Sequence, residues 1–168
     1  PGQIDIRITV KSSSVDEANQ LIAKIIDQIR TLMDEDIYGL DDETLETVIQ
    51  KKIEATSLKL GLAEFGLYEA VTHRLNSAGL PFKRLTTLTP PLTWESLHQN
   101  ADNFLTGLSL DIIFAINYVP SDSLQGLSLW LKTEQKELEL QRSYGGPPEL
   151  GIPWAVNTTL DFIRRNLI

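Results

Sequence analysis

The sequence has no cysteine, and this absence removes several classes of chemistry. Without thiols the chain forms no disulfide, no thiolate zinc site and no cysteine nucleophile. Basic residues are also scarce, because 15 Lys and Arg stand against 23 Asp and Glu and the net charge is −8. That balance disfavours a phosphate backbone or an anionic membrane surface as a partner. We therefore expect neither nucleic acid nor a membrane as the partner.

Long apolar runs are missing as well. The chain has no stretch of about 18 apolar residues and no charged-then-apolar leader, so we expect neither a membrane span nor a signal peptide. We expect a cytoplasmic location. With 168 residues, 42% of them hydrophobic, it is long enough and apolar enough to bury a core. It starts at Pro1 and not at Met, which leads us to expect that residues are missing upstream.

The N-terminal part combines a strand pattern with a helix pattern. Residues 4–10 alternate apolar and polar side chains, which is the period of a strand with one face on a core. Apolar residues then recur at helical intervals over 15–33, which predicts an amphipathic helix lying on that strand. Asp41 and Asp42 are predicted to start a second helix. Residues 1–52 are thus expected to form a small α+β unit.

Strand and helix patterns alternate in the remainder of the chain, as in α/β proteins. Strands are predicted over 58–63, 82–88 and 111–119, with helices between them and a terminal helix from Pro153. The run at 111–119 is apolar on both faces and is expected to be the central strand. Residues 127–132 and 138–141 alternate on either side of a polar turn, which predicts an antiparallel hairpin. We expect 53–168 to form a three-layer α/β domain with a mixed sheet.

Polar and aromatic side chains gather where two of these strands end. Ligands of open α/β sheets bind beyond the carboxyl ends of the strands. Glu64 closes the first strand of the domain, and a carboxylate there either orients a ligand or caps the next helix. The other candidate ligand-binding residues at this edge are Phe65, Tyr68, Glu69, Asn117, Tyr118, Ser121 and Asp122. Because no base and nucleophile pair is identifiable, we assign no catalytic residue and keep ordinary loop polarity as the alternative.

Two acidic clusters and two histidines are the remaining candidates for metal chemistry. Residues 34–36 and 41–43 put six acids within ten positions, but they lack the alternating ligand spacing of a calcium loop. The second cluster is placed to cap a helix. His73 and His98 have no second ligand at a recognisable interval, so both are expected at the surface. We expect no metal and no cofactor.

Three stretches carry a resemblance to a known family. Residues 4–46 join a strand, a long helix and an acidic capped turn in fixed order; Leu62-Ala63-Glu64 ends a strand; and residues 146–167 form a terminal helix pattern. In this order they resemble the CinA (competence/damage-inducible) family. The resemblance implies a KH-like linker domain over 1–52 and a domain like the family's nicotinamide-nucleotide (NMN) amidohydrolase over 53–168.

The resemblance breaks at the residues that would carry catalysis. Where the family has Ser-Cys-Thr-Gly-Gly, this chain has Phe65-Gly66-Leu67-Tyr68-Glu69, so the serine nucleophile is replaced and two glycine positions hold bulky side chains. The family's Gly-rich turn after the central strand is replaced by residues 117–123. This favours a degenerate active site and a non-catalytic structural, interaction or ligand-binding module. The alternative is an NMN deamidase activity retained with altered site residues.

The resemblance also implies partners. These are a second copy of the chain in a homodimer, the upstream domain and a nucleotide-like small molecule. A KH-like unit raises RNA or DNA as well, but such a unit binds through a Gly-x-x-Gly loop with basic neighbours. Residues 1–52 contain only Gly2 and Gly39, and their 6 Lys and Arg against 11 Asp and Glu give a net charge of −5. Nucleic acid therefore stays disfavoured.

Overall fold

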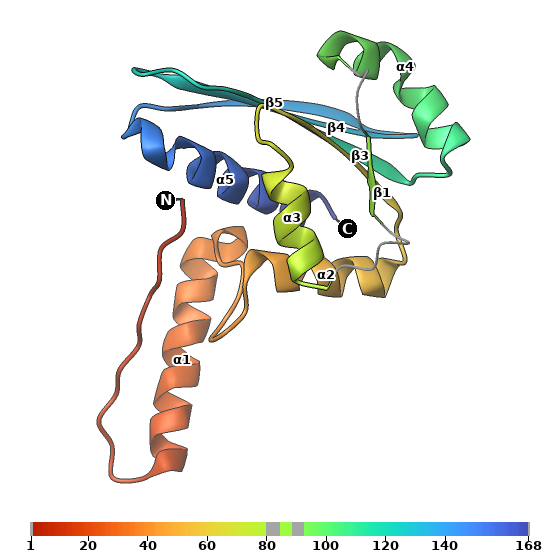
Figure 1. The fold of residues 1–168 in the computed structure, drawn as a ribbon. Helices are drawn as coiled ribbons and strands as arrows, with labels where there is room; N and C mark the ends of the chain where they lie inside the picture. The colour runs from red at the N-terminus through yellow and green to blue at the C-terminus, as the bar shows by residue number, and fades with distance from the viewer. Residues whose placement is uncertain (1, 80–84, 89–92, 168) are drawn as a thin grey trace.

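One mixed sheet of five strands forms the centre of the molecule (Figure 1). The computed structural model describes residues 2–79, 85–88 and 93–167. Its strands are β1 (Leu60–Phe65), β2 (Leu85–Thr87), β3 (Ile112–Val119), β4 (Gln125–Thr133) and β5 (Glu137–Tyr144), in the order β2-β1-β3-β4-β5. β1 is parallel to β2 and β3, whereas β4 is antiparallel to β3 and β5. The predicted central strand and the predicted hairpin are confirmed; part of the strand predicted over 82–88 lies outside the described residues.

Helices cover both faces of the sheet, which gives three layers (Figure 1). Three helices lie on one face, namely α2 (Leu45–Thr56), α3 (Ala70–Ser77) and α5 (Gly151–Asn166), and α4 (Trp94–Gly107) lies on the other. Alternate side chains of β3 feed two apolar clusters, since Phe114 packs with α5 and Ile113 packs with α4. The expected three-layer α/β class is confirmed. None of the described helices is long and apolar enough to cross a membrane.

α2 begins at a threonine and not at the acidic pair. Thr44 is the N-cap, and its hydroxyl and that of Thr47 bind each other's backbone N–H in a capping box. Asp41 sits in a left-handed turn with φ 53°, and the carboxylate of Glu43 accepts the N–H of Leu40. The prediction that Asp41 starts this helix is therefore wrong, because the acids shape the turn that precedes the cap.

α2 is part of the central core. Leu45, Ile49 and Ile53 are fully buried in the same cluster as Phe114 of the sheet. The expected boundary at residue 52 falls within this helix, and the division into a KH-like unit and an α/β domain stays a prediction.

The terminal helix starts earlier than its proline suggests. Residues 148–150 form a short 3-10 turn, η2 (Pro148–Leu150), and α5 begins directly after it, so Pro153 is its third residue and not its first. Ile152, at the start of the helix, is 37% exposed. Leu160 and Ile163 are buried, because they keep the helical spacing of the apolar face.

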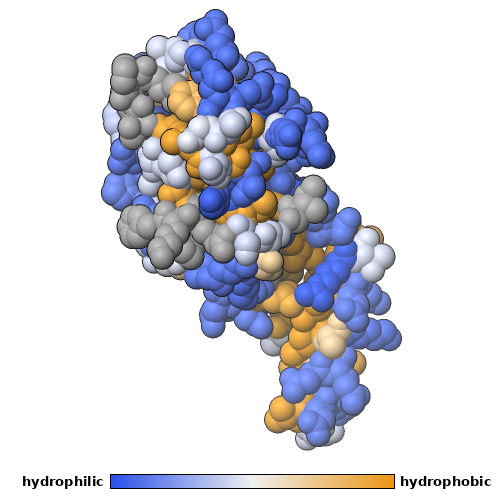
Figure 2. Space-filling model, turned by 90° about the vertical axis from the view of Figure 1, so that its right-hand side faces the viewer, coloured by the Kyte–Doolittle hydropathy of each residue, from blue (hydrophilic) through white to orange (hydrophobic). Residues whose placement is uncertain are grey.

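Residues 3–33 form an arm that stands apart from the sheet (Figure 1). α1 (Val15–Met33) has Ser14 as its N-cap, and no residue of it is buried. Residues 3–10 run back along α1 without forming a strand, and Ile4 is 87% exposed. The prediction of a strand here is wrong for this structure, because no neighbour in the described part of the chain takes up its backbone hydrogen bonds. Figure 2 shows apolar side chains along the arm.

Candidate functional site

Glu64 leaves the end of β1 with its carboxylate on the first turn of α3. Oε2 accepts the N–H of Val71 at 3.0 Å, and Oε1 accepts the N–H of Thr72 at 2.8 Å and the Thr72 hydroxyl at 2.6 Å. The first N–H groups of a helix have no partner within it, and the helix dipole favours a negative charge there. The residue at the N-cap, Glu69, makes no side-chain cap. Glu64 therefore acts as the cap of α3 from the neighbouring strand.

The turn between β1 and α3 is built from left-handed backbone. Gly66 has φ +80°, and a Cβ there would collide with the carbonyl oxygen of Tyr118. Tyr68 and Glu69 have φ values of 54° and 62°, a conformation that non-glycine residues rarely adopt. Leu67, which is 1% exposed, anchors the turn in the core, whereas Tyr68 is 85% exposed. Tyr68 and Glu69 thus have a backbone conformation that suits glycine.

The sheet divides the predicted site residues between its two faces. Glu64 and Tyr118 point toward the layer of α3 and α5, since they alternate with the residues that face α4. Phe65 and Asn117 are opposite each other in the β1–β3 register and belong to the face covered by α4. The four candidate residues on β1 and β3 therefore lie on opposite faces of the sheet.

Tyr118 makes an internal hydrogen bond near the start of α5. Its hydroxyl donates to Oε1 of Gln125, and burial raises the pKa of Tyr118 above its ordinary value. The absence of a Cβ at Gly151 lets both side chains approach α5 closely. Among the described residues, Nε2 of Gln125 has no partner. Ser121 and Asp122 lie in the exposed loop beyond β3.

Phe65 begins a row of aromatic rings on the α4 face. Its ring centroid is 6.0 Å from that of Trp94 in an edge-on contact, Trp94 is 4.7 Å from His98, and His98 is 4.2 Å from Trp130. Nδ1 of His98 is 2.8 Å from the carbonyl oxygen of Trp94, so it carries the proton. His98, predicted at the surface, is half-buried between the indole rings of Trp94 and Trp130. Phe65 is thus a packed ring at the end of β1.

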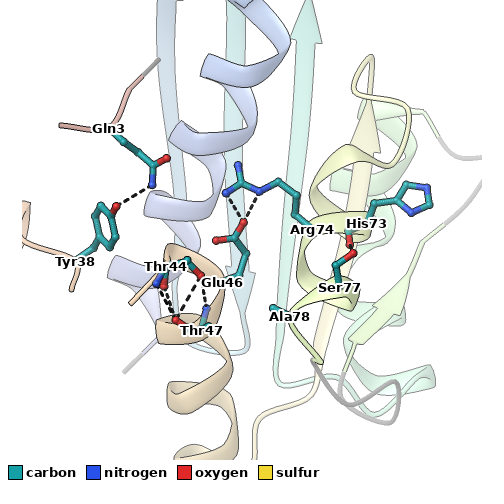
Figure 3. A pocket seen from close by; sticks show the side chains of 9 residues that line it. All are labelled: Gln3, Tyr38, Thr44, Glu46, Thr47, His73, Arg74, Ser77 and Ala78. Atoms are coloured by element: carbon teal, nitrogen blue, oxygen red, sulfur yellow. Dashed lines mark hydrogen bonds and ion pairs between the residues drawn. The ribbon is translucent and has the colours of Figure 1, made fainter. Parts of the chain in front are cut away.

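A cleft of about 520 Å³ opens where the N-terminal segment meets α2 and α3 (Figure 3). Its lining consists of Gln3, Tyr38, Thr44, Glu46, Thr47, His73, Arg74, Ser77 and Ala78. The amide of Gln3 donates to the hydroxyl of Tyr38 at 3.1 Å and ties the arm to the edge of the cleft. His73 is exposed as predicted, and Figure 3 shows its ring pointing away from the cleft.

An ion pair that sequence reasoning does not find lies at this cleft. Nε and Nη2 of Arg74 bind Oε1 of Glu46, while Nη1 donates to Oδ1 of Asn157, so α2, α3 and α5 are joined (Figure 3). The side chain of Glu46 is 10% exposed and that of Arg74 is 36% exposed. Oε2 of Glu46 has no partner among the residues that the structure describes. The sequence signal is weak, since the two residues are separated by 28 positions on different helices.

The first acidic cluster binds the terminal helix. Arg165 contacts Asp36 at 2.7 Å and Asp161 at 2.7 Å, and the hydrogen bond to Asp36 raises the pKa of Arg165. Arg164 donates to the backbone carbonyl of Glu35 at 2.6 Å. These acids therefore hold the base of the arm against α5. Within the described ranges, no group of acids and histidines is arranged to hold a metal ion.

Solved structures of known proteins share this fold. A CinA superfamily protein from Klebsiella pneumoniae matches with a TM-score of 0.57 at 14% identity, over 73% of this chain and 95% of that one. A CinA superfamily protein from Escherichia coli matches with a TM-score of 0.54 at 14% identity, over 79% and 98% of the two chains. The chain therefore has the fold of the CinA superfamily.

Sequence relatives agree with the fold. A CinA-like protein from Acaryochloris marina is 40% identical over 63 residues, which are 38% of this chain and 15% of that protein. A CinA-like protein from Thermosynechococcus vestitus is 35% identical over 86 residues, 49% of this chain and 20% of that protein. Parts of the chain are thus similar in sequence to CinA-like proteins. The matches span a fifth or less of these relatives, and no family model matches the chain.

Proposed function

We propose that this chain is a non-catalytic part of a CinA protein that works by binding other polypeptides. It forms a homodimer and holds a further N-terminal domain in position, with residues 1–52 as the linker unit, in the cytoplasm. The main observation in support is that the carboxylate of Glu64 accepts three hydrogen bonds from α3. A group that caps a helix so completely has little capacity left for a ligand.

The surroundings of Glu64 support this function. Amide hydrolysis by a serine enzyme needs a nucleophile and a base that activates it. Phe65 occupies the serine position of the family motif and packs against Trp94. Beside it, Tyr118 is held in a hydrogen bond with Gln125. The strand ends thus carry packing and capping contacts where an enzyme would present reactive groups.

The arm supports an interaction role. An amphipathic helix in a soluble protein normally buries its apolar stripe. In α1 no residue is buried, and Leu32 is 85% exposed. An apolar face of this kind is typical of a contact surface.

Sedimentation equilibrium over a wide range of protein concentrations tests the proposal. We expect the mass of a dimer, and the same mass at low and at high ionic strength. A strict monomer at the highest concentration would contradict the interaction role.

The retained turn favours a second candidate, in which the chain binds a nucleotide-like molecule or keeps NMN deamidase activity. The observation is the left-handed backbone of Tyr68 and Glu69, because strained conformations cluster at ligand sites. A thermal-shift series with mononucleotides and dinucleotides separates the possibilities. A shift without ammonia release supports ligand binding alone, and release of ammonia from nicotinamide mononucleotide supports the enzyme.

A further inference from the structure

The arm meets the rest of the molecule where the chain changes direction. α1 ends at Asp34, whose φ of 42° is positive and therefore uncommon outside glycine. The short 3-10 turn η1 (Asp34–Asp36) follows, and Ile37 then leaves it in an extended conformation. The residues of η1 are exposed. A few residues at the end of an element that change backbone conformation are typical of a hinge, so we call 34–36 the hinge of the arm.

The helix of the arm has few ties to the core. No residue of α1 is buried. Among the residues that the structure describes, no hydrogen bond or ion pair joins α1 to the sheet or to α2, α3, α4 and α5. The extended segment of the arm adds one neutral hydrogen bond, from Gln3 to the hydroxyl of Tyr38 at 3.1 Å. The direction of the arm therefore depends on the contacts that hold the hinge.

Two arginines at the end of α5 bind the hinge. Nη2 of Arg164 donates to the carbonyl oxygen of Glu35 at 2.6 Å. Arg165 contacts the carboxylate of Asp36 at 2.7 Å and that of Glu35 at 3.5 Å. Asp161 accepts from Arg164 at 2.6 Å and from Arg165 at 2.7 Å, which fixes the orientation of both guanidinium groups. We call these five residues, Glu35, Asp36, Asp161, Arg164 and Arg165, the latch.

The latch has an enclosed half and an exposed half. The side chain of Arg164 is 8% exposed, and its hydrogen bond goes to a backbone carbonyl. Arg165 is 32% exposed, whereas Asp36 and Glu35 are 67% and 72% exposed. Ion pairs at such positions are screened by dissolved salt and contribute little each. The exposed half can therefore open while α5 stays folded on the sheet.

We propose that the latch is a conformational device that sets the direction of the arm. With Arg165 bound to Asp36 the arm points as in Figure 1, and when this pair opens the arm turns about the hinge. The core does not change, because α2 and α5 are held by their own buried side chains. This inference rests on the proposed role of residues 1–52 as a linker unit, and it names the residues that control that unit.

A distance measurement between the arm and the core tests the proposal. Since the chain has no cysteine, spin labels can be attached at two chosen positions of the full 168-residue protein. Gln28→Cys on α1 and Asn103→Cys on α4 are exposed and carry the labels. Pulsed electron paramagnetic resonance gives the distribution of distances between them. Dilution with unlabelled protein removes distances between copies.

Four substitutions in this labelled parent separate the latch from a general effect of charge. Arg165→Gln and Asp36→Asn remove the same ion pair from its two sides. Arg142→Gln on β5 and Asp27→Asn on α1 are the matched controls, because each removes one charge of the same sign at an exposed position outside the latch. All four side chains are at least partly exposed, so circular dichroism should show the same helix content in every variant.

We expect one narrow maximum in the parent and in both controls, and a broader, shifted distribution in both latch variants. High salt should broaden the distribution of the parent and leave that of the latch variants unchanged. A latch variant that keeps the narrow maximum of the parent overturns the proposal, and so does a parent whose distribution is already as broad as that of the variants. Neither result touches the dimer, which sedimentation equilibrium tests separately. A monomer with a salt-dependent arm contradicts the proposed homodimer and leaves the latch in place.

Discussion

Arg74 on α3 holds the nearly enclosed carboxylate of Glu46 on α2 in an ion pair that also reaches Asn157 on α5. The pair joins the helix that follows the arm to the helices of the sheet layer. It adds to the contacts of Arg164 and Arg165 that hold the base of the arm against α5.

Removal of Arg74 should therefore destabilise the protein. Arg74→Met leaves an enclosed carboxylate without its partner, and we expect a loss of about 2 kcal/mol, reduced from the value for a fully buried pair because Arg74 is 36% exposed. The double variant Glu46→Met/Arg74→Met removes the charge as well and should cost less than Arg74→Met alone. Urea denaturation measures both. If the loss of stability in the double variant equals the sum of the losses in Glu46→Met and Arg74→Met, the pair does not act as a unit.

Replacement of Glu64 should lower stability through α3. Glu64→Ala removes three hydrogen bonds from the first turn of the helix, with an expected cost of about 1–2 kcal/mol. Glu69→Ala is the matched control, because the side chain of Glu69 makes no cap. Chemical denaturation compares the two variants. Unchanged stability in Glu64→Ala would mean that the carboxylate has a role other than capping.

Glycine should be tolerated in the turn and not in the helix that follows. Tyr68 is exposed with φ 54°, so Tyr68→Gly relieves an unfavourable backbone and should stabilise the protein by about 0.5–1 kcal/mol. His73→Gly, at an exposed helical position of α3, should destabilise it by about 1 kcal/mol. Thermal unfolding of both variants checks the sign. Destabilisation by Tyr68→Gly would show that the tyrosine side chain makes a contact that stabilises the folded protein.

The start of α1 should respond to acid. Hydrogen bonds from the hydroxyls of Ser12 and Ser13 lower the pKa of Glu17, so the folded turn favours the ionised carboxylate. Its contribution is present above the pKa of the unfolded chain, about 4.3, and is lost as the pH falls through the lower folded value. NMR titration should give Glu17 a lower pKa than the average glutamate. In Glu17→Gln the fraying of this turn should no longer depend on pH over that range.

The sequence predicts those parts of the fold that depend on local periodicity. The run around Phe114 is apolar on both faces and forms the central strand, and Ser14 caps the helix where the pattern begins. Residues 4–10 show the limit of the same reasoning. Their alternation is that of a strand, but a strand also needs a neighbouring strand. The alternation does not indicate which segment that neighbour is.

The site depended on contacts between distant residues, which explains why less of it could be predicted. Glu64 offered two roles at a strand end, and only the position of Thr72 shows which role its carboxylate takes. Nothing in the sequence around His98 indicates that Trp130, far along the chain, packs against its ring. The left-handed turn at Tyr68 was hidden as well, because its residue type argues against that backbone.

Ammonia release from nicotinamide mononucleotide tests most directly whether residues 64–69 are a structural turn or a working active site. Purified protein is incubated with the nucleotide over a range of protein concentrations, beside a sample without protein. If Glu64 caps α3 and Phe65 fills the serine position, the protein releases no ammonia above the blank. Release that rises in proportion to the protein and disappears in Glu64→Gln would contradict the account.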